Sequence, residues 1–488
     1  MKKWVLALGV GAAALGGTVA ARTAMFKPDA VGDGSGITVA AAPAFDTQAA
    51  AQHLSQAVQI QTISHQNPAE DQLAEWDKLH GWLSSTYPKA HAAMQRELLG
   101  KTLLYTWPGS DPAAQPIIVM AHQDVVPVTP GTEKDWKYAP FAGEIADGAV
   151  WGRGTIDDKG SLVALFEALE ALAGQGFKPK RTVILVSGHD EEVGGSGAVA
   201  VAKVLATRKI KALLTIDEGG LIATNTPIIN GPAAMIGVAE KGYVTLRVTA
   251  LAEGGHSSMP PAEIGTINLA KAVIAIHRNQ FAMELRGPAA GMVDALAAKA
   301  GGLTKVAAAN KWLLGGLITA QMAKSPSSAA MLHTTIAPTM LEGSPKENVL
   351  PQSANALINY RIAPWDTSAN VLERARASSK GLGVTVNFTE KPPREPSPVS
   401  SSISPGWQLI VAAAKAGNPD LIASPYLVVG GTDSRSMSGV SDDVYRFAPI
   451  KLATSETKMI HGTNEHMTLI NFEGMISFYA RLIATAAG

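Results

Sequence analysis

The sequence predicts an α/β protein, in which a helix-covered, mainly parallel sheet is interrupted by an inserted α+β unit of ferredoxin-like order. Three observations lead to this fold class. The chain has 488 residues, which is too long for one ordinary core and indicates two domains. Between residues 116 and 217, short apolar segments alternate with helical segments, as in βα units. Between residues 243 and 389, the predicted elements follow a β-α-β-β-α-β order.

The N-terminal segment is predicted to lie outside the folded part. Lys2 and Lys3 precede an apolar run rich in glycine and alanine, and small residues at 18–21 offer a cleavage site, which is typical of a bacterial export signal. We therefore expect residues 1–21 to be a signal peptide or an N-terminal anchor, and residues 22–44 to be a linker. The protein is then exported, and is either periplasmic or membrane-anchored facing the periplasm. The sequence leaves open whether the segment is cleaved.

Residues 45–239 are predicted to form the first part of the main domain. Apolar residues at helical spacing, such as Trp76 and Leu79, indicate helices that cover a sheet, and short aliphatic runs indicate its buried strands. The predicted elements, in order, are helices at 45–63 and 70–87, strands at 98–107 and 116–120, a helix at 161–173, a strand at 183–186, a helix at 196–207 and a strand at 212–216.

Residues 240–391 are predicted to be an inserted lid or dimerisation domain, and residues 392–488 to complete the main domain. Within the inserted domain, segment 281–330 is rich in alanine, leucine, methionine and glycine and is longer than a ferredoxin-like unit needs. It could line a pocket for a hydrophobic side chain or acyl group, form the core of the lid, or contact another subunit. The predicted elements are strands at 243–251, 332–337, 355–363, 383–389 and 426–429, and helices at 264–277, 368–378, 406–416 and after residue 466.

The composition excludes some classes of partner and ligand. Lys+Arg and Asp+Glu both number 41, so the formal net charge is zero, and no basic stretch interleaves with aromatic residues. Nucleic acid is therefore not an expected partner. The chain contains no cysteine, so any metal site must be built from histidine, aspartate and glutamate.

The predicted strand at 183–186 ends in an acidic turn that contains Glu191 and Glu192. Functional sites of α/β proteins usually lie at the carboxyl ends of the sheet strands. Adjacent carboxylates disfavour each other's ionisation unless a cation or separate roles relieve them. A metal ion would provide the cation and the separate roles, because one carboxylate could bind it while the other takes a proton from water that the metal acidifies. Alone, the pair is better explained as a solvated acidic loop, because short motifs are weak signals, and only the other motifs of the chain change this interpretation.

Other predicted segment ends also carry acidic or histidine side chains. His122 and Asp124 stand two residues apart at a strand end, so their side chains can share one face, as a histidine ligand and its supporting carboxylate do. Asp157 precedes a helix in a glycine-rich loop, and Asp217 ends the next apolar strand. Taken singly, a structural histidine and an acidic helix cap explain the first two features. Their repetition at successive segment ends favours a shared site.

Five motifs in sequence order resemble those of the M20 family of di-zinc exopeptidases and aminoacylases. Within that family, the export segment and the long insert look most like the carboxypeptidase S and N-acyl-amino-acid hydrolase branch. The resemblance implies a zinc-exopeptidase-like catalytic domain with an inserted ferredoxin-like lid. The motifs are His122-Gln-Asp124, Gly154-Thr-Ile-Asp157-Asp-Lys-Gly160, Asp190-Glu-Glu192-Val-Gly194, Asp217-Glu-Gly219 and His461-Gly-Thr-Asn-Glu465.

The resemblance assigns the metal-binding and catalytic roles. Asp157 would bridge two metals, with His122 and Asp217 completing one site and Glu192 and His461 the other. Glu191 would be the general base, and Asp124 would orient His122. The cofactors implied are two divalent ions, zinc first, with cobalt or manganese as alternatives. The family also implies a cis peptide between Asp157 and Asp158.

Substrate selection would come from further residues that match the family. Arg361 resembles the arginine of the lid that grips a substrate carboxylate, and Asn348, Gly431 and Thr432 resemble its other carboxylate-binding groups. His256 matches the histidine that stabilises the oxyanion. In many relatives this histidine comes from a partner subunit, so a homodimer is allowed. A structural ion pair for Arg361 and an ordinary turn around Gly431 remain alternatives.

The function implied is hydrolysis, by a two-metal enzyme, of the amide bond that joins a C-terminal amino acid with a free carboxylate to a small peptide or an N-acyl group. Carboxypeptidase, dipeptidase and aminoacylase activities all fit this description. A noncatalytic exported protein that binds peptides or amino-acid conjugates is the alternative. The only membrane contact expected is through the N-terminal segment.

Overall fold

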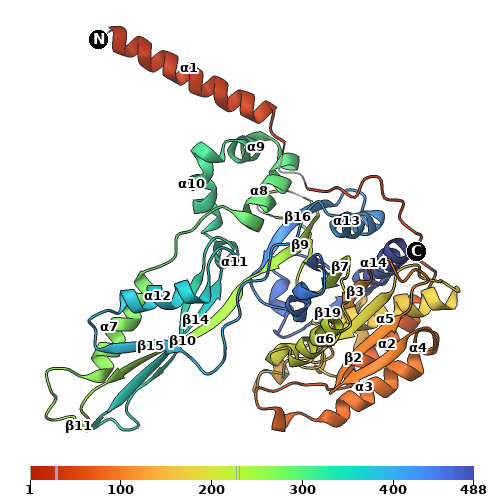
Figure 1. The fold of residues 1–488 in the computed structure, drawn as a ribbon, viewed down its shortest axis with the longest axis horizontal. Helices are drawn as coiled ribbons and strands as arrows, with labels where there is room; N and C mark the ends of the chain where they lie inside the picture. The colour runs from red at the N-terminus through yellow and green to blue at the C-terminus, as the bar shows by residue number, and fades with distance from the viewer. Residues whose placement is uncertain (1, 28–30, 227, 230) are drawn as a thin grey trace.

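The computed structural model describes residues 2–27, 31–226, 228–229 and 231–488. These residues form a ten-stranded mixed sheet with helices on both faces, a separate four-stranded antiparallel sheet, and a helical layer from which the first helix projects (Figure 1). The predicted α/β fold class is confirmed. The first residue of the expected export segment and residues 28–30 of the expected linker lie outside the described residues.

The large sheet has the strand order β1-β2-β6-β3-β7-β17-β9-β8-β18, with β16 paired to β9. Its centre is parallel, because β3 pairs in parallel with both β6 and β7. The central strands are short runs of aliphatic residues with every side chain buried, as expected for strands covered on both faces. The bounds are β1 (Gln95–Leu99), β2 (Thr102–Trp107), β3 (Ile117–Met120), β6 (Val183–Ser187), β7 (Leu214–Asp217), β8 (Leu221–Ala223), β9 (Ala233–Glu240), β16 (Ile422–Val428), β17 (Val444–Arg446) and β18 (Lys451–Leu452).

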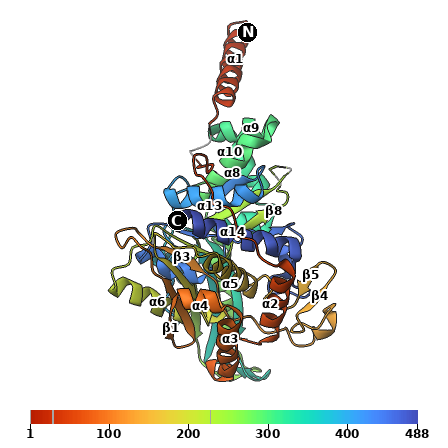
Figure 2. The same ribbon diagram turned by 90° about the vertical axis from the view of Figure 1, so that its right-hand side faces the viewer.

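Helices cover both faces of this sheet. The larger layer packs on the main apolar core, and Figure 2 shows several of its helices on the side facing the viewer. This layer contains α2 (Thr47–Gln59), α3 (Leu73–Thr86), α4 (Pro88–Ala93), α5 (Lys159–Gly174), α13 (Pro405–Gly417) and α14 (Leu469–Ala487). On the other face, α6 (Ser196–Thr207) packs with the 3-10 segment η4 (Asp433–Gly439). A small sheet of β4 (Glu144–Ala146), β5 (Ala149–Trp151) and β19 (His466–Thr468) lies beside them, and η1 (Pro68–Glu70), η2 (Glu133–Asp135), η3 (Glu191–Val193) and η5 (Thr457–Met459) are short 3-10 turns.

Some predicted bounds in this part were wrong. The single strand predicted at 98–107 is a hairpin of β1 and β2, because Gly100 turns the chain with a φ of 64°. The helix predicted at 45–63 is shorter, since Asp46 caps it and it ends at Gln59. Strand β9 was not predicted, although all eight of its residues are buried.

The four-stranded sheet has the order β12-β14-β10-β15, which is the ferredoxin-like arrangement expected from the sequence. We call this sheet and its two helices the lid domain. Only Lys241 separates β9 from β10, so one extended run of chain passes from the large sheet into the lid (Figure 1). The elements are β10 (Gly242–Leu251), α7 (Gly265–Arg278), β12 (Thr335–Glu342), β14 (Ser353–Ile362), α12 (Ser368–Ser378) and β15 (Val384–Phe388), with a two-stranded ribbon of β11 (Gly255–His256) and β13 (Val349–Leu350).

The segment 281–330 forms a helical layer rather than an extension of the lid sheet. Its helices are α8 (Gly287–Ala300), α9 (Gly302–Ala309), α10 (Lys311–Met322) and α11 (Pro326–Ala330). The buried side chains of α8 pack against β9 and β16, whereas α1 (Lys2–Ala24) contacts α9 and extends away from the body (Figures 1 and 2). None of the described helices has both the length and the apolar character needed to cross a bilayer.

Candidate metal centre

Five predicted ligands come from separate segments. His122 follows β3, Asp157 precedes α5, Glu192 lies in η3 after β6, Asp217 ends β7, and His461 follows η5. Because β3, β6 and β7 are parallel neighbours, their carboxyl ends meet at one edge of the sheet, and the acidic and histidine side chains gather there.

Asp157 lies between the two histidines. Its Oδ1 atom is 2.9 Å from Nε2 of His122, and its Oδ2 atom is 3.0 Å from Nε2 of His461. The same nitrogen of His461 lies 3.1 Å from Oε2 of Glu192. A single buried carboxylate thus offers one oxygen to each of two histidine-containing groups. This is the arrangement in which one carboxylate can bridge two cations.

Asp124 connects His122 to the loop that carries Glu191. Its backbone carbonyl accepts a hydrogen bond from Nδ1 of His122 at 2.9 Å, which leaves Nε2 directed at Asp157. Its carboxylate accepts hydrogen bonds from Ser64 Oγ at 2.6 Å and from the backbone N–H groups of Glu191 and Glu192 at 3.1 Å. Asp124 therefore fixes the histidine ring and the glutamate turn at once.

Asp157 is held from the opposite side by Glu465. The Oε1 atom of Glu465 accepts hydrogen bonds from the backbone N–H groups of Ile156 at 2.8 Å and Asp157 at 3.2 Å, and its other oxygen pairs with Arg153 at 2.7 Å. The peptide bond between Asp157 and Asp158 is cis, as expected. The Asp158 carboxylate accepts a hydrogen bond from the backbone N–H of His122, so the two motifs are joined directly.

The electrostatics of the cluster fit divalent cations. Burial, followed by neighbouring carboxylates such as Asp433 and Glu192, raises the pKa of Glu191 well above its ordinary value. Burial also raises the pKa of Glu192, and Asp157 adds to the effect. Among the described residues, Oε1 of Glu192 is buried with no hydrogen-bond partner. Crowded buried carboxylates with an unused oxygen and two imidazoles form the donor set that zinc and similar ions take.

Two acidic residues of the site were missed by the sequence analysis. Glu218 offers a carboxylate oxygen within 4.8 Å of ligand atoms of His122 and Glu191, and Asp433 lies buried against the glycines at 188 and 195. The predicted ligand Asp217 has Oδ2 hydrogen-bonded to the backbone N–H of Ser434 at 2.9 Å. Glu218 could have been considered, because it stands next to Asp217 in the motif, whereas nothing local pointed to Asp433.

Three arginines lie where the lid domain meets the main domain. Arg361 of β14 stacks over the Tyr243 ring at 4.9 Å, and burial, together with the nearby Arg394, lowers its pKa. Arg394 Nη2 donates to the carbonyl of Gly194 at 2.7 Å, and Arg435 Nη2 donates to the carbonyl of Glu395 at 2.8 Å. Only Arg361 was predicted. The structure gives it no ion pair among the described residues, so the structural ion-pair alternative is not supported.

Thr432 lies at the same junction. Its hydroxyl donates to Oε1 of Glu240 at 2.6 Å, and Glu240 also pairs with the buried Arg446 at 2.7 Å. Gly431 is exposed beside the guanidinium of Arg435. The predicted turn residues are thus tied to the point where the chain passes into the lid.

His256 and Asn348 are not brought to the cluster. Both are exposed on the β11–β13 ribbon, where the backbone carbonyl of Asn348 accepts a hydrogen bond from Ser257 at 3.1 Å and the His256 ring contacts Ser258. The ribbon is at the outer tip of the lid (Figure 1). The structure therefore separates the predicted catalytic residue His256 and the predicted substrate-binding residue Asn348 from the cluster, while keeping them next to each other.

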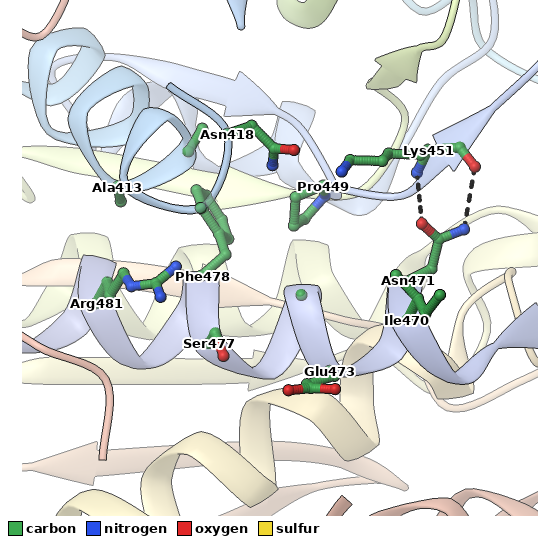
Figure 3. A pocket seen from close by; sticks show the side chains of 13 residues that line it. Ala413, Asn418, Pro449, Lys451, Ile470, Asn471, Glu473, Ser477, Phe478 and Arg481 are labelled. Atoms are coloured by element: carbon green, nitrogen blue, oxygen red, sulfur yellow. Dashed lines mark hydrogen bonds between the residues drawn. The ribbon is translucent and has the colours of Figure 1, made fainter. Parts of the chain in front are cut away.

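A surface hollow of about 290 Å³ lies elsewhere, between α13 and α14 (Figure 3). Asn471 lines it, and its side-chain amide bonds both backbone groups of Lys451 at 3.0 Å. Glu473 and Arg481 also face the hollow, which contains none of the cluster residues. It is a groove between two helices and is separate from the candidate metal centre.

Comparisons with known proteins give concordant results. A family model described as Peptidase family M20/M25/M40 matches residues 118–485. A probable carboxypeptidase S-like 2 of Dictyostelium discoideum is 34% identical over an alignment that covers 89% of this chain and 84% of that protein. An N-fatty-acyl-amino acid synthase/hydrolase PM20D1.1 of Danio rerio is 34% identical over an alignment that covers 88% of this chain and 84% of that protein. The crystal structure of an M20 family metallo-carboxypeptidase, Sso-CP2 from Sulfolobus solfataricus, has the same fold, with a TM-score of 0.65, 17% identity, and coverage of 90% of this chain and 99% of that one.

Proposed function

The chain belongs to peptidase family M20/M25/M40, and we propose that its preferred substrates are N-acyl amino acids with a free carboxylate, hydrolysed at a centre of two zinc ions. Its general activity is that of a metal-dependent hydrolase, which cleaves the amide bond joining a C-terminal amino acid to a small peptide or an N-acyl group. The single observation that carries the two-ion proposal is the position of Asp157, with one carboxylate oxygen facing each of His122 and His461.

The family motifs assign the predicted ligands to two groups. His122 with Asp217 and Glu192 with His461 would hold one ion each, and Asp157 would contact both. When bound, divalent cations supply Lewis acidity, which polarises a carbonyl and lowers the pKa of water. Glu218, close to His122, is a further oxygen donor on the first side.

Glu191 is placed to move the proton. Its side chain is half-buried, with a carboxylate oxygen within 4.8 Å of a ligand atom of His122, and its backbone N–H is fixed by Asp124. The carboxylate would thus lie within reach of water held at the cluster. Glu191 accepts a proton from that water as the oxygen bonds to the amide carbon. It then gives the proton to the leaving nitrogen as the carbon–nitrogen bond breaks, so the products are a carboxylic acid and an amine.

The arginines would select the substrate. A planar guanidinium binds a carboxylate with two parallel hydrogen bonds. Arg361, Arg394 and Arg435 lie close together, because the charge of Arg394 helps to lower the pKa of both Arg361 and Arg435. A free carboxylate placed among them would sit between the acidic cluster and the lid. This supports a substrate whose amino-acid end is a free acid rather than an amide.

The lid tip suggests a homodimer. His256 and Asn348 lie on an exposed ribbon away from their own cluster, and we infer that they reach the cluster of a second subunit. His256 would then donate a hydrogen bond to the carbonyl oxygen as it gains negative charge.

A substrate panel tests the proposal. The zinc-loaded protein is assayed against acetyl-leucine, a long-chain acyl-leucine, a leucine dipeptide and the carboxamide of each, with released amine as the readout. We expect the acyl-leucines to be hydrolysed faster than the dipeptide, and the carboxamides to be poor substrates. Faster hydrolysis of the dipeptide would contradict the substrate class, and equal hydrolysis of acids and amides would contradict the role of the arginines.

A further inference from the structure

The outer face of α9 and α10 is an exposed apolar surface without an acidic side chain. The exposed residues of α10 recur along one side of the helix, and Leu317 and Trp312 are 69% and 56% exposed. Leu303 of α9 is 87% exposed. Met322 is the only residue of α10 that is buried. A helix that is apolar on all sides is normally enclosed by protein or lipid, so this exposure needs a partner.

The first helix continues this surface. Nδ2 of Asn310, between α9 and α10, donates to Oγ1 of Thr23 at 3.2 Å, and the Arg22 guanidinium lies over the Trp312 ring at 6.0 Å. Beyond this contact, α1 carries exposed small and apolar residues such as Leu15. Two segments almost 300 residues apart in sequence thus present one apolar face at the same end of the molecule (Figures 1 and 2).

The charge of this region differs from that of the whole chain. The chain has equal numbers of acidic and basic residues, but residues 287–324 contain four lysines and a single acid, Asp294. That acid is buried and lies 2.5 Å from Nζ of Lys311. Lys299 and Lys324 are exposed, as are Arg22 and Lys27 near the end of α1. The apolar face is therefore bordered by positive charge.

We propose that the outer face of α9 and α10, with the adjoining end of α1, docks onto the surface of an anionic lipid bilayer. Apolar side chains would enter the boundary between headgroups and acyl chains, tryptophan would sit at the headgroup level, and the bordering lysines and arginine would contact anionic headgroups. A second protein copy would cover the apolar side chains equally well, but would bring like charges together. The positive border therefore favours lipid over self-association.

The absence of cysteine makes a direct test possible. A Leu317→Cys variant of the full chain is labelled with a polarity-sensitive fluorophore and mixed with vesicles of phosphatidylglycerol and phosphatidylcholine. We expect a blue shift of the label and its quenching by lipids that carry a nitroxide on the acyl chain. Leu341→Cys, on the exposed edge of the lid at 68% exposure, is the matched control and should show neither effect.

Three outcomes would overturn the proposal. In the first, the protein fails to bind the vesicles. In the second, it binds while the label at 317 stays in water, which would leave contact to α1 alone. In the third, the fluorescence of the label shifts to the blue without vesicles as the protein concentration rises, which would identify a second copy as the occupant. As a second measurement, the double variant Lys299→Glu and Lys324→Glu should weaken vesicle binding about tenfold or more, and high salt should remove the difference.

Discussion

Arg446 and Glu240 form a fully buried ion pair, with Nε and Oε1 2.7 Å apart and neither side chain exposed. Glu240 is the last residue of β9, so the pair lies where the chain enters the lid, and it also receives the hydroxyl of Thr432. Removing one member leaves a buried charge without its partner. Stability, lid position and the substrate-binding turn therefore depend on the same two side chains.

We expect Arg446→Met to lower the free energy of unfolding by about 3–5 kcal/mol, because it strands the Glu240 carboxylate in the interior. Urea denaturation measures the change. The exposed pair of Arg208 and Glu97, 2.6 Å apart, provides the matched control, since Arg208→Met should cost less than about 1 kcal/mol. Equal losses of unfolding free energy in the two variants would show that burial of the Arg446–Glu240 pair does not determine its contribution to stability.

Glu191→Gln should lower kcat by about a hundredfold to ten-thousandfold, because the amide cannot accept a proton from water. Metal content, measured by mass spectrometry of the purified protein, should stay at the level of the parent, since the residue is assigned as base and not as ligand. Glu144→Gln, on the exposed β4, is the control for a surface change of the same chemistry. Parental kcat in the Glu191→Gln variant would refute the assignment.

Arg361→Ala should raise KM for free-acid substrates by about 10- to 100-fold, the loss expected for hydrogen bonds to a charged group, with a much smaller effect on kcat. For the carboxamide of the same substrate, KM should barely change. Arg374→Ala provides a control in the same lid, because Arg374 stacks on Phe281 away from the junction. A parallel rise of KM for acid and amide would indicate a structural role for Arg361.

Mixing two inactive variants tests the role of the lid tip. If His256 acts in the partner's site, His256→Ala and Glu191→Gln subunits form heterodimers with one complete site, and an equal mixture recovers about 25% of parental activity when half the dimers are mixed. Activity after subunit exchange is the measurement. If each variant stays inactive in the mixture while size analysis shows exchange, His256 does not act across the interface.

Lys241 should make stability depend on pH. Its ammonium donates to the carbonyls of Ala330 and His333 at 2.8 Å, and burial, followed by the nearby Arg361, lowers its pKa from 10.5 to about 7, while Asp366 opposes the shift. Between these two values the unfolded chain binds more protons than the folded one, so the free energy of unfolding rises with pH across this window. Below about pH 7 both states are protonated, and the contribution no longer changes.

Lys241→Met should flatten this rise. Urea denaturation at about pH 7, 8 and 9 should give a smaller slope for the variant than for the parent. Lys458→Met, at an exposed position of η5, should keep the parental slope. An unchanged slope in Lys241→Met would place the origin of the pH dependence in other groups.

The order of elements was largely readable from sequence because local signals agreed with the fold. Helices α6 and α12 have the predicted bounds, since each follows a glycine or a capping threonine and has amphipathic spacing. Strand β9 was missed because its apolar residues do not alternate with polar ones and are interspersed with alanine and glycine. Its side chains are buried alternately in the two apolar cores on either side of the sheet. Strand β12 begins three residues later than expected and continues through Pro338, which an edge strand tolerates.

The site was predictable where neighbouring residues in sequence are neighbours in space. His122 with Asp124, and Glu191 with Glu192, are such pairs, and the family motifs order them along the chain. Arg394, Arg435 and Asp433 were beyond this reasoning, because their positions depend on how the lid and the large sheet pack on each other. The exposure of His256 likewise follows from the position of the ribbon at the tip of the lid (Figure 1), which no local signal predicts.

The hydrogen bond from Arg394 to the carbonyl of Gly194 has a mechanical consequence. Arg394 lies on the segment that returns from the lid, and Gly194 directly follows the turn that carries the glutamates. A rotation of the lid away from the large sheet must break this hydrogen bond, and the turn then loses its contact with the lid. Closure of the lid over a substrate and the positioning of Glu191 are therefore coupled. A substitution where the chain enters or leaves the lid would then alter turnover without contacting any reacting group.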